Sequence, residues 1–377
     1  MLTDRNWLAR VTSIIAVCVF AACPAQDEKK PAEKAAAPAQ AEKKAETKKA
    51  AAEPSAAAPK ADSPEGSHPE CVGPMSEEPK ETFAVGDLKI ERAGSTLTIT
   101  NTDPDDEFRL GQITDVKDYT PENEANIEVA LKWFAAEKVD AIAVTGDIGE
   151  SQAGIESIVR AVAKSGKLVL VMAGNRECRT HFSAAVAAVQ KENKNVINMN
   201  LVRVINTDDV SLVSLPGYYN PSYIHCPEGC SYTKDDVSGL DAFVKKTTGP
   251  VRVLLSHGPP KMSGPKGLDR IHEEVNVGDP ALTEYLKTSN AFPFGCFGNI
   301  QEAGGYATNL AGDTRVAQNA FADQLYMNPG PIDAVRWSML DGTESLGMAG
   351  LLHIKGKQAK HKIYRIRTGE AKVKKAE

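Results

Sequence analysis

The sequence predicts an α/β fold in which two packed β-sheets are flanked by helices. Two short apolar runs, Ala141–Thr145 and Leu168–Met172, have the length and the branched side chains of strands that are buried on both faces. Helical patterns alternate with such runs in the first half of the chain, whereas short strands and turns predominate in the second half. This order indicates two sheets with helices on their outer faces.

Residues 1–22 have the features of a secretion signal, because basic residues precede a short apolar run. The run ends Phe20-Ala21-Ala22-Cys23, which resembles a bacterial lipobox. We therefore expect a lipid on Cys23 to anchor the chain to a membrane, since each buried CH2 contributes about 0.8 kcal/mol. Ordinary cleavage and release is the alternative. Pro24 follows directly, and the absence of Asp at this position favours the outer membrane, so the expected location is the bacterial cell envelope, periplasmic or surface-exposed.

Residues 23–80 are rich in Ala, Lys, Glu and Pro and are expected to form a disordered tether, because this composition buries too little apolar area to offset the ordering entropy. Residues 81–366 are then one large domain, and residues 367–377 form a charged tail. The formal net charge of -6 argues against nucleic acid as a partner, which would favour a basic surface.

The domain opens with alternating polar and apolar residues around Gly94 in the segment 87–102, which predict a β-hairpin. Residues 108–114 are expected to form a strand. Pro121 then begins an amphipathic helix with acidic residues in its first turn. Further helices are expected at 154–163, 183–189, 237–245 and 281–286, and further strands at 202–205, 210–214, 251–255, 292–297, 348–354 and 361–366.

Polar side chains follow several predicted strands at their carboxyl ends, where ligands of α/β sheets usually bind. Two neighbouring strands end in Gly146-Asp147 and Gly174-Asn175, one with a carboxylate and one with an amide. Glu177 is expected to brace the second turn. The other strand-end residues are Asp115, Lys117, Arg176, His257, Asn299 and Gln301.

In their order these strand ends resemble the motifs D-x-H, G-D, G-N-H-[ED], H and G-H-x-H of the calcineurin-like metallophosphoesterase family, over residues 110 to 354. The resemblance implies that family's two-sheet fold and a phosphoric-ester hydrolase scaffold with two metal ions that share Asp147. The first ion would use the positions of Asp115, Lys117, Asp147 and Gln301. The second would use Asp147, Asn175, His257 and Asn299.

Substitutions at these positions argue against two-metal catalysis. Lys117 lies two residues after Asp115 and is expected on the same face of the chain. Its ammonium would repel a divalent ion about 4 Å away by roughly 8 kcal/mol at an effective dielectric constant of about 20. We therefore expect Lys117 to pair with Asp115 and Asp147 in place of the first ion. Gln301 also replaces a histidine of the motif.

Arg176 occupies the position of the family's proton donor. Its guanidinium stays protonated and cannot act as a general acid, but it can bind an anion. The second position retains Asp147, Asn175, His257 and Asn299, whose oxygen-rich donor set suits Mg²⁺, Mn²⁺ or Ca²⁺. We therefore expect either no metal or one divalent ion.

Three functions remain open. The first is a pseudoenzyme that binds a phosphate-like anion or an envelope protein. The second is a phosphoesterase that uses a single ion. The third is a tethered scaffold whose working surface is the loop between Cys226 and Cys230, around which Tyr218, Tyr219, Tyr223 and Tyr232 cluster.

Five cysteines follow Cys23, and an exported compartment permits disulfides. A local bridge between Cys226 and Cys230 is the first expectation. The pairing of Cys71, Cys178 and Cys296 is left open, and the odd number predicts at least one free or intermolecular thiol.

Overall fold

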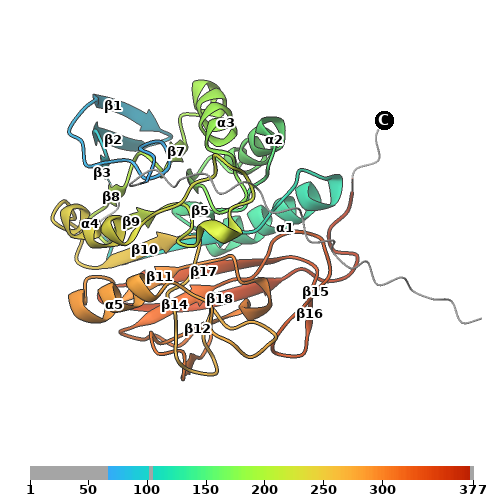
Figure 1. Ribbon diagram of the computed structural model, residues 1–377. Helices are drawn as coiled ribbons and strands as arrows, with labels where there is room; N and C mark the ends of the chain where they lie inside the picture. Colours follow the sequence, from blue (N-terminus) through green and yellow to red (C-terminus); the bar gives the residue numbers. More distant parts are fainter. Residues whose placement is uncertain (1–66, 102–104, 374–377) are drawn as a thin grey trace, which may run out of the picture. The chain divides into compact units, whose positions relative to one another are not determined.

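The computed structural model describes residues 67–101 and 105–373 (Figure 1). The predicted signal peptide, Cys23 and most of the predicted tether lie outside these residues. No helix in the described part of the chain has the length and apolar character needed to cross a membrane.

The smaller sheet has six strands in the order β18-β17-β4-β5-β6-β7. Strands β4 to β7 run parallel, whereas β17 is antiparallel to both β4 and β18. The strands are β4 (Glu107–Ile113), β5 (Ala141–Thr145), β6 (Leu168–Met172), β7 (Val196–Asn198), β17 (Met348–Lys355) and β18 (Gln358–Arg365).

The larger sheet has ten strands in the order β1-β2-β3-β8-β9-β10-β11-β14-β12-β13. The central strands β9, β10, β11 and β14 run parallel. The strands are β1 (Lys80–Val85), β2 (Leu88–Ala93), β3 (Thr96–Ile99), β8 (Val204–Asn206), β9 (Ser211–Leu215), β10 (Arg252–Ser256), β11 (Phe294–Cys296), β12 (Tyr306–Thr308), β13 (Arg315–Val316) and β14 (Leu325–Asn328). A separate ribbon pairs β15 (Trp337–Ser338) with β16 (Glu344–Ser345).

Five α-helices cover the outer faces of the sheets in the described chain (Figure 1). α1 (Pro121–Glu137), α2 (Gln152–Ala163) and α3 (Arg179–Glu192) lie on the smaller sheet, and α4 (Lys234–Val244) and α5 (Pro280–Ser289) on the larger one. The Thr120 side chain caps α1 by accepting a hydrogen bond from the Asn123 N–H. Short 3₁₀ turns occur at η1 (Pro221–Tyr223) and η2 (Gln301–Ala303).

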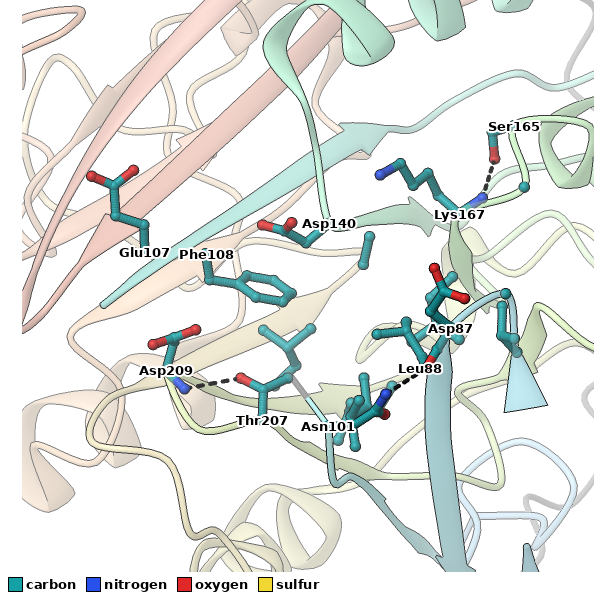
Figure 2. Close-up of a pocket in the computed structure, with 18 residues that line it drawn as sticks. Asp87, Leu88, Asn101, Glu107, Phe108, Asp140, Ser165, Lys167, Thr207 and Asp209 are labelled. Atoms are coloured by element: carbon teal, nitrogen blue, oxygen red, sulfur yellow. Dashed lines mark hydrogen bonds between the residues drawn. The ribbon is translucent and has the colours of Figure 1, made fainter. Parts of the chain in front are cut away.

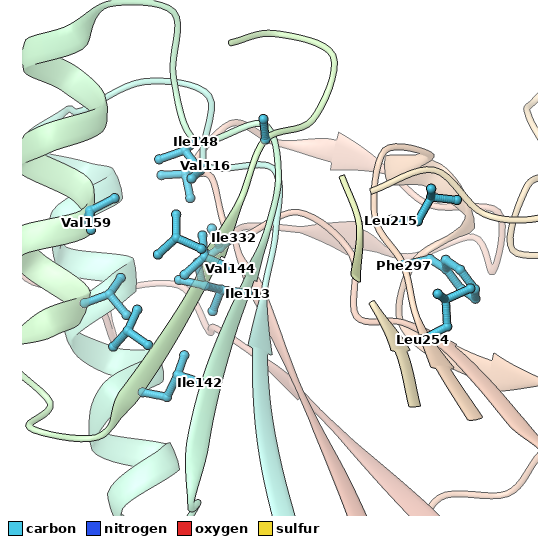
Figure 3. Close-up of a cluster of buried hydrophobic side chains, with 14 of the residues drawn as sticks. Ile113, Val116, Ile142, Val144, Ile148, Val159, Leu215, Leu254, Phe297 and Ile332 are labelled. Atoms are coloured by element: carbon cyan, nitrogen blue, oxygen red, sulfur yellow. The ribbon is translucent and has the colours of Figure 1, made fainter. Parts of the chain in front are cut away.

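Alternating side chains of the buried strands pack into different layers. In β5, Ala141 and Ala143 face the cluster between the sheets, whereas Ile142 and Val144 pack beneath the helices. Figure 3 shows Ile142 and Val144 on the side of the helices. Successive side chains of a strand point to opposite faces, and both faces of these strands are buried. The strands are therefore apolar along their whole length. The predicted fold class is therefore confirmed.

The end of the tether and several short strands differ from the sequence prediction. The predicted tether extends to residue 80, but Cys71 and Val72 are already buried in the core, at 1% and 7% exposure. The three-residue strand β7 was not predicted, because so short a run carries no recognisable period.

A cavity of about 420 Å³ opens between the sheets at the amino ends of β4, β5 and β6 (Figure 2). Phe108, Leu168 and Leu212 contribute apolar walls, and Asp140 and Lys167 contribute charged groups. None of the strand-end residues described below lines it, so this cavity is separate from the candidate site.

Candidate metal centre

The candidate site lies at the carboxyl ends of β4, β5, β6, β10 and β11, where both sheets contribute loops. Four residues in these loops adopt left-handed backbone conformations: Asp115 (φ 55°), Lys117 (φ 68°), Asp147 (φ 53°) and Asn299 (φ 63°). Such conformations cost about 1 kcal/mol or more for a residue with a side chain and gather at functional sites. Four left-handed residues in neighbouring loops therefore indicate a functional site at these strand ends.

Glycines allow the loops from the two sheets to approach closely. A Cβ atom on Gly174 would lie 2.6 Å from Oδ1 of Asp147 and 2.8 Å from Cδ2 of His257. A Cβ atom on Gly146 would lie 2.6 Å from Nδ1 of His257. These distances are shorter than a carbon atom tolerates, so each glycine is needed to bring His257 against the β5 and β6 loops.

Asp147, Asn175 and His257 converge at the centre of the site. Nε2 of His257 lies 2.8 Å from Oδ1 of Asn175 and 3.1 Å from Oδ1 of Asp147. The Asn175 amide is fixed in this orientation because its Nδ2 donates a hydrogen bond to the Tyr223 carbonyl oxygen. The structure therefore brings together three of the four residues predicted for the second ion.

The hydrogen bonds of His257 define its chemistry. Nδ1 lies 2.8 Å from the Thr145 carbonyl oxygen and must donate a proton to it, because a carbonyl only accepts. Nε2 therefore faces two oxygen acceptors and needs either a proton or a cation between them. Burial disfavours the charged ring, but the Asp147 carboxylate outweighs burial and raises the pKa of His257 to about 10. The positive charge of His257 in turn lowers the pKa of Asp147 despite its burial.

Asp115 lies beside this group, and its ligand atoms are within 4.8 Å of those of Asp147 and His257. Both of its oxygens accept hydrogen bonds: Oδ1 from Nε2 of Gln301 at 2.6 Å, and Oδ2 from the Asn299 N–H at 3.1 Å. The Asn299 side chain lies against the Tyr218 hydroxyl. Gln301 and Asn299 thus stabilise Asp115 as hydrogen-bond donors.

The predicted pairing of Lys117 with Asp115 and Asp147 is wrong. Nζ of Lys117 lies 3.0 Å from Oδ2 of Asp333 and 3.8 Å from the centroid of the Trp337 ring. The prediction applied the two-residue period of a strand to Asp115 and Lys117. β4 ends at Ile113, and the left-handed conformations beyond it remove that period.

Arg176 lies at the edge of the site. Its Nε is 3.9 Å from Oδ2 of Asp147, and its Nη1 reaches Glu150, 3.3 Å away. Glu150 also lies 3.4 Å from Nδ1 of His225. The Arg176 side chain is 23% exposed, so part of it remains in contact with solvent.

Glu177 braces the loops, as predicted. Its buried carboxylate accepts hydrogen bonds from the backbone N–H groups of Gly174 (2.7 Å), Gly149 (3.4 Å) and Ile148. These bonds tie the β5 loop to the β6 loop. Burial, reinforced by Asp147, raises the pKa of Glu177 to about 7.

The predicted disulfide between Cys226 and Cys230 is also wrong. The disulfides are Cys71–Cys230 and Cys178–Cys226, and Cys296 is a buried free thiol. Spacing along the chain suggested a local bridge, but the fold brings distant cysteines to this loop. Both disulfides fasten the segment 217–232 beside the site.

Sequence reasoning missed Asp333, Trp337 and Glu150. Asp333 and Trp337 follow β14 in a region rich in turns, where no motif marks them. The available signal for Asp333 was an acidic residue after a buried strand, which is the same signal that identified Asp147. Glu150 follows the Gly146-Asp147 turn by three residues and carried no separate signal.

Comparison with known proteins bears on this site. Residues 108–289 match the family model described as calcineurin-like phosphoesterase. None of the curated proteins matches the chain.

Several solved structures are similar to the chain. TT1561 of Thermus thermophilus is 13% identical, with a TM-score of 0.48, covering 69% of this chain and 99% of that one. GAP50, described as the anchor in the inner membrane complex of Plasmodium, is 12% identical, with a TM-score of 0.43 and coverages of 71% and 86%. A dimetal phosphatase from Danio rerio is 11% identical, with a TM-score of 0.40 and coverages of 68% and 98%.

At these TM-scores the similar structures carry no argument about the chemistry of the chain. The family match covers the strand ends that supply Asp115, Asp147, Asn175 and His257. The sheet arrangement and the convergent side chains agree with it. Residues 108–289 thus match the calcineurin-like phosphoesterase model, and within them the structure brings Asp115, Asp147 and His257 together as a candidate metal site.

Proposed function

We propose that this domain binds one divalent ion and, with it, a phosphate-like anion, and that it acts as a binding protein rather than an efficient hydrolase. The observation that carries this proposal is the convergence of Asp147, Asn175 and His257. The carboxylate and amide oxygens lie 3.1 Å and 2.8 Å from Nε2 of His257, and a bound ion would take the place of the proton that Nε2 holds between them. A carboxylate, an amide oxygen and an imidazole suit Mn²⁺ or Mg²⁺.

Asp147, Asn175 and His257 would hold the ion, with Asp115 as a further oxygen donor. A bound ion supplies a Lewis acid toward a phosphoryl oxygen. Arg176 supplies a second positive group at the site edge and can form a bidentate contact with the anion. For this contact, the guanidinium group of Arg176 must give up part of its ion pair with Glu150.

The residues at the first-ion position do not fit a second ion. Gln301 presents its amide nitrogen to Asp115, and this N–H group cannot ligate an ion. Lys117 carries a positive charge instead of a metal-ligating group, and its ammonium forms an ion pair with Asp333. The proton-donor position holds Arg176, which cannot release a proton at neutral pH. One ion and slow or absent turnover are expected.

A slow single-ion phosphoesterase is the second candidate. It is favoured by Asp115, whose ligand atom lies within 4.8 Å of those of Asp147 and His257 and enlarges the donor set.

Calorimetry on the chelator-treated protein tests both candidates. Titration with Mn²⁺ should give one bound ion, and methylphosphonate should bind only to the Mn²⁺-loaded protein. Asp147→Asn should abolish both, whereas Asp118→Asn, an exposed acid outside the cluster, should change neither. Two bound ions or none would overturn the proposal. Mn²⁺-dependent hydrolysis of an aryl phosphate that is lost in Asp147→Asn would favour the second candidate over the first.

We further propose that a lipid on Cys23 anchors the protein in the bacterial envelope, where an envelope protein is an alternative partner. The support is the Phe20-Ala21-Ala22-Cys23 sequence after an apolar run. Cys23→Ser should move the protein from the membrane fraction to the soluble fraction of the producing cell. Retention of the variant in the membrane would contradict the lipid anchor.

A further inference from the structure

Three tyrosines form one wall beside the candidate metal centre, and they are called here the tyrosine wall: Tyr218, Tyr219 and Tyr223. The Tyr218 ring lies 6.2 Å from the His257 ring, 5.0 Å from Tyr219 and 6.4 Å from Tyr223, measured between centroids. Tyr218 is 3% exposed and cannot contact a ligand over its face. It supports the other two rings.

Tyr223 is the exposed member of the wall, at 60% exposure. Its carbonyl oxygen accepts a 2.8 Å hydrogen bond from Nδ2 of Asn175, the bond that aims the Asn175 oxygen at His257. An exposed aromatic ring is therefore attached directly to the backbone that positions the centre. The Tyr223 ring meets the Tyr218 ring edge to face, at an interplanar angle of 86°, and most of the residue remains exposed to solvent.

The segment that carries the tyrosine wall is firmly held. The disulfides Cys71–Cys230 and Cys178–Cys226 fasten it, and the His225 N–H donates a 2.9 Å hydrogen bond to the Asn175 carbonyl. Stacking on a ring held by such a segment costs little conformational entropy. The tyrosine wall is thus preorganised, because its segment is held in place before a flat group binds.

We propose that the ligand is a phosphate ester whose organic group is a flat unsaturated ring, and that this ring stacks on Tyr223 while the phosphoryl group lies at the Asp147–Asn175–His257 centre. The inference rests on the proposed function, because it assigns the organic part of the same anion. The shared chemistry of phosphate and flat ring occurs in nucleotides and in phosphotyrosine.

Phosphonates test this inference without turnover. On the Mn²⁺-loaded full chain, calorimetry should show benzylphosphonate binding about tenfold more tightly than cyclohexylmethylphosphonate, which has the same carbon skeleton without the aromatic ring. Tyr223→Ala should reduce this ratio to about one, and Tyr223→Phe should keep it. Phe321→Ala removes another exposed aromatic ring, away from the site beside His353, and should leave the ratio unchanged.

The outcomes separate this inference from the proposed function. If no phosphonate binds, including methylphosphonate, the proposed function fails. If methylphosphonate binds but the benzyl and cyclohexylmethyl compounds bind equally, or their ratio survives Tyr223→Ala, only the present inference fails. Adenosine 5′-phosphate and O-phosphotyrosine should both lose affinity in Tyr223→Ala, and the tighter of the two identifies the source of the ring. If neither loses affinity, the stacking role is overturned.

Discussion

The ammonium group of Lys117 lies 3.0 Å from the carboxylate of Asp333, which is 1% exposed and belongs to the turn after β14. Burial raises the pKa of Asp333, and the charge of Lys117 opposes this effect. The pair ties the β4 loop of one sheet to the β14 loop of the other. Lys117 thus neutralises a structural carboxylate rather than the carboxylates of the metal centre.

Lys117→Met should therefore destabilise the fold by about 3 kcal/mol, because it leaves the buried Asp333 without its partner. The double variant Lys117→Met/Asp333→Asn should recover most of the loss, since no unpaired charge remains. Urea unfolding measures the four free energies of the cycle. Lys132→Met on the exposed face of α1 is the control and should cost less than about 0.5 kcal/mol. Additive losses in the double variant would show that the pair is not coupled.

Glu177→Gln should weaken the centre without touching a ligand. The amide retains one acceptor oxygen but directs an NH2 group at a backbone N–H, so a loss of about 2 kcal/mol in stability is expected. The β5 and β6 loops are no longer tied, so the Mn²⁺ affinity should fall about tenfold. Glu192→Gln, which alters an exposed ion pair with Arg160, serves as the control in both measurements. An unchanged Mn²⁺ affinity would restrict Glu177 to a role in folding.

The two disulfides should differ in their effect on the centre. Cys178→Ser/Cys226→Ser and Cys71→Ser/Cys230→Ser open loops with sequence separations of 48 and 159 residues, so chain entropy predicts losses of about 4 and 5 kcal/mol. Cys178 lies three residues after Asn175, so only the first pair should also lower the Mn²⁺ affinity measured by calorimetry. Equal Mn²⁺ affinities in the two double variants would contradict this assignment.

His361 should make the protein less stable in mild acid. It is 1% exposed, neither ring nitrogen has a hydrogen-bond partner among the described residues, and burial lowers its pKa to about 4. The unfolded chain takes up the proton near pH 6.5, so between about pH 6.5 and pH 4 it binds protons that the folded chain does not. The free energy of unfolding should fall by about 3 kcal/mol as the pH is lowered across this window.

His361→Leu should remove this part of the acid sensitivity, whereas His272→Leu at an exposed position should retain it. Denaturant unfolding at pH values from about 7 down to about 4 measures the difference. Parallel pH profiles for the wild type and His361→Leu would refute the assignment to His361.

The sequence predicts the fold well where both faces of an element are buried. β5 and β6 begin and end at the predicted residues, because a buried strand is apolar along its whole length and polar residues mark its end. The same reasoning locates Asp147, Asn175 and His257 at strand ends, and the structure joins them. The ends of the parallel neighbours β5 and β6 must meet at one sheet edge, so the closeness of Asp147 and Asn175 follows from topology, whereas His257 comes from β10 of the other sheet.

The remaining details depend on loops, where no period governs the direction of a side chain. Lys117 lies beyond the last residue of β4, and its direction depends on a left-handed backbone angle and on Asp333, more than 200 residues later. Disulfide connectivity fails for a related reason: the spacing of Cys226 and Cys230 is local, whereas their partners come from other parts of the chain.

The left-handed turns at Asp115, Asp147 and Asn299 have a consequence for engineering this centre. They belong to the backbone and are held by glycine contacts and by Glu177, so they do not depend on which side chain occupies the neighbouring ligand positions. A designer who introduces histidines at 176, 299 and 301 would change side chains on an existing frame, without having to rebuild the loops.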